Sequence, residues 1–244
     1  MTQTVICMKW GTRYGPEYVN RIYSMVRRHT KRPTRVVCYT DDTAGLHEGV
    51  EAFPLPHIVL PPDKEWLPWR KLCVWQKDLE GVSGDVLFLD LDTVVTGSLD
   101  EFFDYEPGHF CVAVNWTQRG AGIGNTSVFR FPVGVHTYIY DRIMNECDDV
   151  LKKHRNEQIF ISREITGMKF WPEEWCVSFK ASLIPWWPLN FFLVPPLPAS
   201  AKVVAFPGKP DPDEAVDGVW PRKHWWQALY KHVRPTPWIA RHWR

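Results

Sequence analysis

Hydrophobic residues in the first 42 positions follow a strand pattern, then a helix pattern, then a strand pattern again. The run TVICM (4–8) is short and apolar, as in a buried strand. After the turn-like segment WGTRYGP, apolar residues recur at helical spacing within 17–29: Val19, Ile22, Met25 and Val26. The run TRVVCYTDD (34–42) then predicts a second strand. This order of elements is that of a βαβ unit.

A βαβ unit predicts a parallel sheet, and in such sheets ligands bind beyond the carboxyl ends of the strands. The residues that follow the two predicted strands are Trp10 to Tyr14 and Thr40 to Asp42. We therefore expect Trp10, Tyr14 and Asp41 to contact a ligand. Trp10 and Tyr14 are equally compatible with packing in the hydrophobic core.

The pattern continues to alternate between strands and helices along the next hundred residues. A Pro-rich loop, a short helix, three strands and an amphipathic helix are predicted in turn, at 54–69, 70–81, 84–92, 109–116, 125–132 and 136–154. The helical stretch at 136–154 places one set of side chains on its apolar side: Tyr138, Ile139, Ile143, Met144, Val150 and Leu151. The elements predict one α/β domain over residues 1–219, with a mostly parallel central sheet flanked by helices, followed by a Trp-rich basic segment at 220–244.

Composition and charge narrow the classes of ligand. Hydrophobic residues make up 45% of the chain and charged residues 23%, as in ordinary globular proteins, whereas 14 Trp are more than usual and favour binding surfaces. The net charge of +1 provides no overall attraction for nucleic acid. The six cysteines are scattered singly, which favours buried thiols in a reducing cytoplasm, and no run of residues reaches the length of a membrane span.

The most informative segment is GDVLFLDLDTVVTGSLDEFF, in which a buried strand runs into two carboxylates separated by one residue. Residues i and i+2 of a strand point to the same face, so Asp90 and Asp92 are expected to converge on one cation at the end of the strand. Such oxygen ligands suit Mg²⁺ or Mn²⁺, and these ions chelate phosphate oxygens. An acidic pair at a strand end also commonly caps the next turn or helix.

Several further motifs stand in a fixed order around this pair. They are KLCVW at 71–75, Tyr14, the run Asn125-Thr126-Ser127, the pair Glu157-Gln158, and KVVAFPGKPDP at 202–212. Together with DVLFLDLDTVVTGSLDEFF they resemble glycosyltransferase family 8, the retaining enzymes that include glycogenin, up to about residue 213. The resemblance implies an A-type glycosyltransferase fold and transfer of a sugar, with retention, from a nucleotide-sugar, most simply a UDP-sugar, to an acceptor hydroxyl.

The resemblance also implies roles for residues at the matching positions. Tyr14 would pack on the uracil ring, with Trp10 and Asp41 nearby. Lys71, Asn125, Ser127, Gly208 and Lys209 would bind the phosphates and the sugar of the donor. Glu157 and Gln158 would act on the transferred sugar, Glu157 by stabilising positive charge and Gln158 by positioning, because an amide cannot accept a proton as a base.

Two departures from the family pattern concern the closing segment. The family has a histidine there as the third protein ligand of the metal, and the candidate positions in this chain hold Ala205 or Pro207. The nearest acidic residues in sequence are Asp211 and Asp213. The family lysine is also displaced, since Lys209 directly follows Gly208.

Other interpretations of the same residues remain open. FLDLDTVV also resembles the signature of haloacid-dehalogenase phosphohydrolases, with Asp90 as nucleophile, and a carbohydrate-binding relative without activity would fit the missing histidine. Residues 220–244 contain five Trp, six Lys or Arg and no acid. They would either pack on the domain or contact the inner face of a membrane, where a lipid-linked acceptor is one alternative to a glycan or a small molecule.

Overall fold

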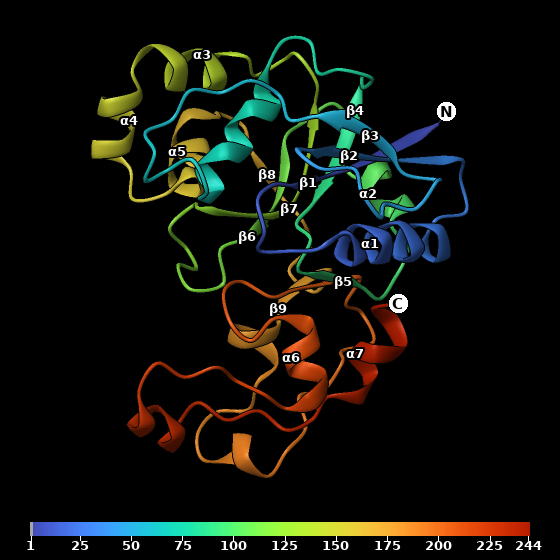
Figure 1. Cartoon of the computed structure of the whole chain (residues 1–244), viewed down its shortest axis with the longest axis vertical. Helices are drawn as coiled ribbons and strands as arrows, with labels where there is room; N and C mark the ends of the chain where they lie inside the picture. Colours follow the sequence, from blue (N-terminus) through green and yellow to red (C-terminus); the bar gives the residue numbers. More distant parts are fainter. Residues whose placement is uncertain (1) are drawn as a thin grey trace.

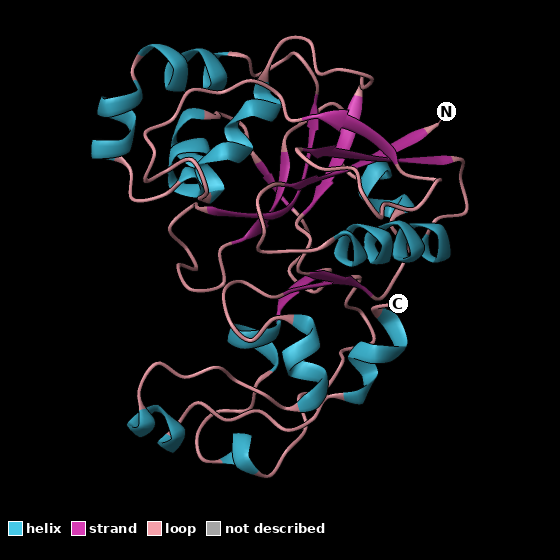
Figure 2. Ribbon diagram, viewed as in Figure 1, coloured by secondary structure: helices cyan, strands magenta, loops and turns pink. Residues whose placement is uncertain are grey.

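The computed structural model describes residues 2–244 and contains a seven-stranded sheet with helices on both faces (Figures 1 and 2). The strand order is β3-β2-β1-β4-β7-β6-β8. The strands are β1 (Gln3–Lys9), β2 (Thr34–Thr40), β3 (Glu51–Pro54), β4 (Asp85–Leu89), β6 (Cys111–Val114), β7 (Gly124–Pro132) and β8 (Lys169–Phe170). β3, β2, β1 and β4 are parallel, and β7 is antiparallel to both of its neighbours. The mostly parallel α/β sheet predicted from the sequence is therefore confirmed.

The central strands are apolar throughout because helices cover both of their faces. Along β1, Val5 and Cys7 belong to the core on the side of α1 (Pro16–His29), whereas Ile6 and Met8 belong to the core on the opposite side. That second side is covered by the 3₁₀ helix η1 (Pro68–Trp75), α3 (Tyr138–Asn145), α4 (Cys147–Lys153) and α5 (Glu157–Glu164). α2 (Asp100–Asp104) lies on the α1 side, through Phe102.

The amphipathic stretch 136–154 forms two helices, so the prediction of one continuous helix is wrong. α3 ends at Asn145, and Glu146 has φ −129° and ψ 36°, outside the helical region. The residues at the break, including Asn145 and Asp148, hydrogen-bond readily to nearby backbone and therefore favour helix ends over helix interiors. α4 then starts with Cys147 and the acidic Asp148 and Asp149. The apolar pattern over 136–154 continues across Glu146, so it gives no sign of the break between the two helices.

A second, smaller sheet begins directly after Asp92, with strand order β5-β10-β9. Its strands are β5 (Thr93–Val95), β9 (Cys176–Ser178) and β10 (Val203–Ala205). Beyond it lie the π-helix η2 (Phe179–Leu183), the 3₁₀ helices η3 (Leu189–Phe191) and η4 (Trp225–Leu229), and the helices α6 (Pro212–Asp217) and α7 (Pro237–His242). Figure 1 shows these orange and red segments at the end of the molecule opposite α3.

Four of the five tryptophans of residues 220–244 fall into two groups, and the fifth, Trp220, is partly buried against the core. Trp238 and Trp243 are buried with Ile239 in the same core as α1, and the guanidinium carbon of Arg21 lies 3.8 Å from the ring centroid of Trp243. Trp225 and Trp226 are exposed. The last helix therefore packs on the domain, while the segment before it remains at the surface.

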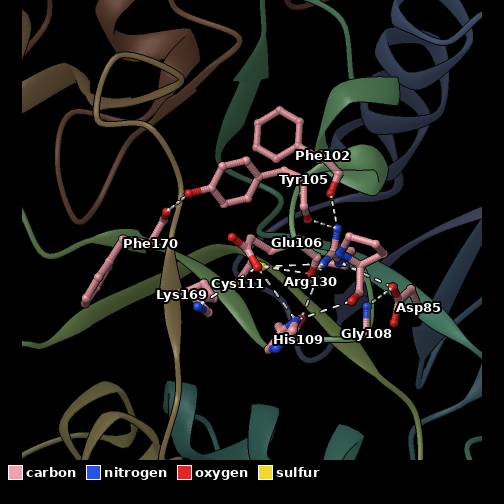
Figure 3. A network of polar contacts seen from close by, with 11 residues as sticks. Asp85, Phe102, Tyr105, Glu106, Gly108, His109, Cys111, Arg130, Lys169 and Phe170 are labelled. Carbon is pink, nitrogen blue, oxygen red and sulfur yellow. Dashed lines mark hydrogen bonds and ion pairs between the residues drawn. The ribbon is translucent and has the colours of Figure 1, made fainter.

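A fully buried arginine fixes the connection between α2 and β6 (Figure 3). The side chain of Arg130, on β7, has no exposed surface. Its guanidinium donates to the backbone carbonyls of Phe102, Tyr105 and Glu106, with 2.6 Å to the Tyr105 oxygen, and it lies 3.7 Å from Asp85. Buried carbonyl groups without a donor are costly, and the arginine supplies donors to this turn, in which the Glu106 carbonyl also accepts the His109 amide.

We expect Arg130→Met to lower the free energy of unfolding by about 3–5 kcal/mol, because it leaves Asp85 and three carbonyl groups without their partner. Urea denaturation followed by tryptophan fluorescence measures the change. The control is Lys152→Met on the exposed side of α4, which should stay within about 0.5 kcal/mol of the unmodified protein. Equal stabilities of the two variants would show that Arg130 is dispensable.

Candidate functional site

A cavity of about 470 Å³ opens where β1 and β4 end and the chain turns toward the second sheet. Of the twelve site residues predicted from the sequence, ten line this cavity: Trp10, Tyr14, Lys71, Asp90, Asp92, Asn125, Ser127, Glu157, Gln158 and Gly208. They come from segments that lie far apart in the sequence. The structure therefore brings the predicted motifs to one place.

Lys71 is the centre of the polar network in the cavity floor. It lies on η1, and only 4% of its surface is exposed. Its Nζ is 3.2 Å from both carboxylate oxygens of Asp90, 3.0 Å from the carbonyl oxygen of Thr126 and 3.8 Å from Glu157. The Thr126 hydroxyl donates to Glu157 at 3.0 Å. A buried ammonium requires such partners, so the lysine, two acids and one threonine form a single unit.

Asp90 and Asp92 lie in a turn, so the prediction that they extend from one face of a strand is wrong. β4 ends at Leu89 and β5 begins at Thr93, although the Asp90 amide still donates to the Ser127 carbonyl at 2.9 Å. The Thr93 hydroxyl donates to the carbonyl of Asp90 at 2.7 Å and stabilises the turn. Both carboxylates nevertheless line the cavity, because the turn brings them to the same side.

Asp92 is held in a strongly perturbed environment. Tyr14 donates its hydroxyl to Asp92 Oδ2 at 3.2 Å. Burial, followed by the charges of Asp90 and Asp211, raises the pKa of the Asp92 carboxyl to about 7. Burial also raises the pKa of Tyr14, so its hydroxyl remains a donor. The site thus contains a carboxylate whose charge no nearby cation fully compensates.

The helix α5 supplies the next two side chains. Asn156 caps this helix by accepting from the Ile159 amide at 3.0 Å, and Glu157 and Gln158 are the first two helical residues. The helix N-terminus favours the negative charge of Glu157. Within residues 2–244, the buried Oε1 atom of Gln158 has no hydrogen-bond donor. The cavity therefore contains an amide with an unused acceptor.

The mouth of the cavity includes Trp66, which the sequence did not single out. Gly11 has φ +62°, and the Trp66 ring lies 2.8 Å from the point where a Cβ on Gly11 would stand. Any other residue at position 11 would displace this ring. Trp66 is 58% exposed and lines the cavity together with Arg13. Its signals in the sequence were the high Trp content and the nearby K-L-x-x-W motif.

Two predicted residues, Asp41 and Lys209, do not line the cavity. Asp41 accepts the backbone amide of Gly11 at 2.8 Å, so it holds the loop that carries the cavity wall. Lys209 Nζ lies 2.6 Å from Asp211 and 2.7 Å from Glu214, and these acids form the capping box of α6. The two residues stabilise loops beside the cavity. Because neither lines it, the structure does not support their predicted contact with a ligand.

The closing segment places Pro207 and Ala205 differently. Pro207 lines the cavity, whereas Ala205 is buried in β10 opposite Thr93 of β5. The carboxylate of Asp213 accepts from Tyr18, and Asp211 caps α6, so neither lines the cavity. No group of three or more His, Cys, Asp or Glu side chains able to hold a metal occurs in residues 2–244. A cation at Asp90 and Asp92 would therefore need ligands from a bound molecule or water.

Solved structures of glycosyltransferases share this fold. The galactosyltransferase LgtC, in complex with donor and acceptor sugar analogs, matches with a TM-score of 0.61 and 13% identity over 86% of this chain and 89% of that chain. GlyE from Streptococcus pneumoniae matches with a TM-score of 0.55 and 13% identity, and the bifunctional WbbM with 0.56 and 14%. Each match covers 86% of this chain, but 56% of GlyE and 46% of WbbM.

The sequence itself matches no protein-family model and no curated protein. At 13–14% identity the structural similarity establishes the fold. The chain therefore has the A-type glycosyltransferase fold that the sequence predicted.

We expect the Asp92 carboxyl to make the stability of the metal-free protein depend on pH. Its folded-state pKa of about 7 lies above the value of about 3.9 in an unfolded chain, so the protonated form favours folding. This contribution is complete below about pH 4 and is lost as the pH rises through 7. Asp92→Asn should therefore be more stable than the unmodified protein at pH 8 by about 1–3 kcal/mol, and by much less at pH 5.

Urea denaturation in EDTA at the two pH values measures this difference. Asp63→Asn, at an exposed position, is the control and should show a difference that does not grow with pH. A constant difference for Asp92→Asn as well would mean that the carboxyl titrates normally.

Proposed function

We propose that this chain is a glycosyltransferase that binds a UDP-sugar in the cavity and transfers the sugar, with retention, to an acceptor hydroxyl. The observation that carries the proposal is the lining of the cavity, where Asp90, Asp92, Lys71 and Gln158 meet beyond the ends of parallel strands. Nucleotides bind at such positions in α/β sheets. The shared fold with LgtC, whose structure holds donor and acceptor sugar analogs, supports the same reading.

The charges of the cavity favour a divalent cation together with the donor. Two basic residues line it, Arg13 and Lys71, against three acidic residues, Asp90, Asp92 and Glu157. A diphosphate alone would meet a net negative surface, whereas Mn²⁺ or Mg²⁺ would make the whole complex close to neutral. The carboxylate oxygens of Asp90 and Asp92 are the ligand type that these ions prefer. The two carboxylates thus fit a cation whose remaining ligands are phosphate oxygens and water.

Such a cation would supply neutralisation of the charge that develops on the departing diphosphate. The protein would hold the two carboxylates that bind the cation in a fixed orientation. Lys71 fixes the Asp90 carboxylate through two contacts of 3.2 Å, and Tyr14 fixes Asp92 through its hydroxyl. Because these side chains are already ordered, the binding of a donor need not arrange them.

The two first residues of α5 fit the reacting end of the donor. The acceptor atom of Gln158 would accept a hydrogen bond from a hydroxyl of the sugar or of the acceptor. A further structure of LgtC is that of an active-site mutant in which glutamate replaces a glutamine, and we assign Gln158 a position of this kind. The Glu157 carboxylate, 3.8 Å from the Lys71 ammonium, can stabilise positive charge on the sugar ring.

The mouth of the cavity fits the nucleoside. Trp10, Tyr14 and Trp66 offer aromatic faces on which a base can stack. Asn125 and Ser127, on β7, offer amide and hydroxyl groups to the ribose or to the sugar. Apolar walls with a few polar groups are typical of small-molecule sites.

A phosphohydrolase mechanism with Asp90 as nucleophile is less well supported. Both oxygens of Asp90 face the Lys71 ammonium, which lowers their nucleophilicity. In the described residues 2–244, no further acidic pair lines the cavity. The phosphohydrolase alternative is therefore not favoured.

We expect UDP with Mn²⁺ to raise the melting temperature of the protein, and Asp92→Asn to abolish the part of this shift that depends on the metal. A ligand that binds only the native state stabilises it by RT ln(1 + [L]/Kd), about 2.7 kcal/mol at a hundredfold excess over Kd. A neutral amide is a poor ligand for a hard cation, so the mutant should respond to UDP equally with Mn²⁺ and with EDTA.

Asp63→Asn is the matched control, since it removes an exposed carboxylate outside the cavity and should keep the full shift. A response to UDP that is the same in EDTA for the unmodified protein would remove the cation from the proposal. The absence of any response to UDP or other nucleotides would contradict donor binding itself.

We expect Pro207→His to raise the affinity for Mn²⁺, because position 207 faces the cavity that contains both aspartates. Calorimetric titration of Mn²⁺ in the presence of UDP measures this affinity, and Pro207→Ala controls for the loss of the proline ring. Ala205→His should instead destabilise the protein by about 1–3 kcal/mol, since a buried strand has no room for an imidazole. Tighter Mn²⁺ binding by Ala205→His would contradict the placement of this segment.

A further inference from the structure

The end of the molecule farthest from the main sheet carries an unusual number of exposed apolar side chains. They belong to two segments, 186–194 and 219–230, which Figure 1 shows in orange and red below α6. The largest are Trp186, Trp187, Phe192, Trp225, Trp226 and Leu229, with Trp225 84% and Phe192 74% exposed. Proteins rarely expose so many large apolar groups together unless they bind another surface. We call these two segments the aromatic face.

The two segments are tied together, so the aromatic face is a built surface. Trp187 donates its indole N–H to the Leu229 carbonyl at 2.9 Å. Asn190 donates to the carbonyls of Tyr230 and His232 at 3.0 and 2.9 Å, and the rings of Phe191 and His232 stack with centroids 4.6 Å apart. These contacts join residues about 40 positions apart in the sequence. The exposed rings are thus held outward by a fixed scaffold.

The charged side chains within the two segments of the aromatic face, Arg222 and Lys223, are both basic. Residues 175–210 and 218–244 contain no Asp or Glu, and the second segment contains six Lys or Arg. Arg222 and Lys223 are exposed beside Trp225. Of the ion pairs formed among residues 2–244, none uses a basic side chain after Lys209. The Lys and Arg side chains after residue 209 are therefore available to an anionic partner outside the chain.

We propose that the aromatic face docks onto an anionic phospholipid bilayer. Trp side chains favour the boundary between headgroups and acyl chains, where the ring is buried and its N–H stays among polar groups. Lys and Arg beside them are attracted by the negative surface of such a bilayer. No helix among residues 2–244 is both long and apolar enough to cross it, so the contact would be one of surface docking.

The helix η2, which ends three residues before the first segment of the aromatic face, reaches the mouth of the cavity. Lys180, on η2, has its Nζ 3.5 Å from the point where a Cβ on Gly208 would stand, and Gly208 lines the cavity. Burial, followed by the charge of Lys231, lowers the pKa of Lys180. A bilayer against the aromatic face would therefore bring lipid headgroups close to the cavity. Resting on the proposed function, this placement assigns a lipid-borne hydroxyl as the acceptor.

The test uses the full chain and vesicles of phosphatidylcholine with and without phosphatidylglycerol. We expect sedimentation with the anionic vesicles only, weakening as salt is added, because screening reduces the attraction. The double variants Trp225→Ser with Phe192→Ser, and Arg222→Glu with Lys223→Glu, should each lower the partition coefficient about tenfold or more.

Matched controls lie outside the aromatic face. Lys152→Glu with Lys153→Glu repeats the charge change on α4, and Val135→Ser with Val59→Ser removes exposed apolar groups from other loops. Both should bind vesicles as the unmodified protein does. The melting temperature of each variant without ligand shows whether it remains folded.

Three results would overturn the proposal. They are absence of binding to anionic vesicles at low salt, equal loss in the controls, and self-association in ultracentrifugation that Trp225→Ser with Phe192→Ser abolishes. The last would assign the face to a second copy of the chain. Vesicle binding without any response to nucleotides would contradict the proposed function alone, whereas a nucleotide response without vesicle binding would contradict only the docking surface.

Discussion

The buried ammonium of Lys71 connects four parts of the chain that are separate in sequence. It contacts Asp90 after β4, Thr126 on β7 and Glu157 on α5, and it comes itself from η1. Burying a lysine is unfavourable unless all of these partners are present, so the cavity floor assembles only when the two halves of the sheet and both helices have met. The fold and the cavity thus depend on the same interaction.

The sequence predicts the central strands well because helices cover both of their faces, which leaves continuous apolar runs such as TVICM and DVLFL. The sequence pattern does not predict where a helix or strand is interrupted by a local change in the backbone. The break at Glu146 and the turn at Asp90 to Asp92 both lie within patterns that continue across them. Periodicity records which side chains are apolar, whereas a turn depends on hydrogen bonds such as that from Thr93 to the Asp90 carbonyl.

Much of the cavity could be predicted, because its motifs stand in a recognisable order. Trp66 could not, since its position depends on contact with Gly11, fifty-five residues away in sequence, and only the positive φ of that glycine leaves room for the ring. Asp41 and Lys209 were predicted to bind the ligand, but they bind neighbouring loops. The order of motifs along the chain indicates which segments lie near the cavity. Which of their side chains point into it is known only from the folded structure.

The small sheet begins at Thr93, directly after the acidic turn, and the chain after Gln158 adds only Pro207 and Gly208 to the cavity wall. All other lining residues lie within the first 158 positions. The remainder of the chain nevertheless supports the cavity from behind, because Trp238, Ile239 and Trp243 complete the core that α1 shares with the main sheet. Substitutions at its exposed positions would leave the cavity lining unchanged, whereas substitutions of these three residues would loosen the wall on the side of α1.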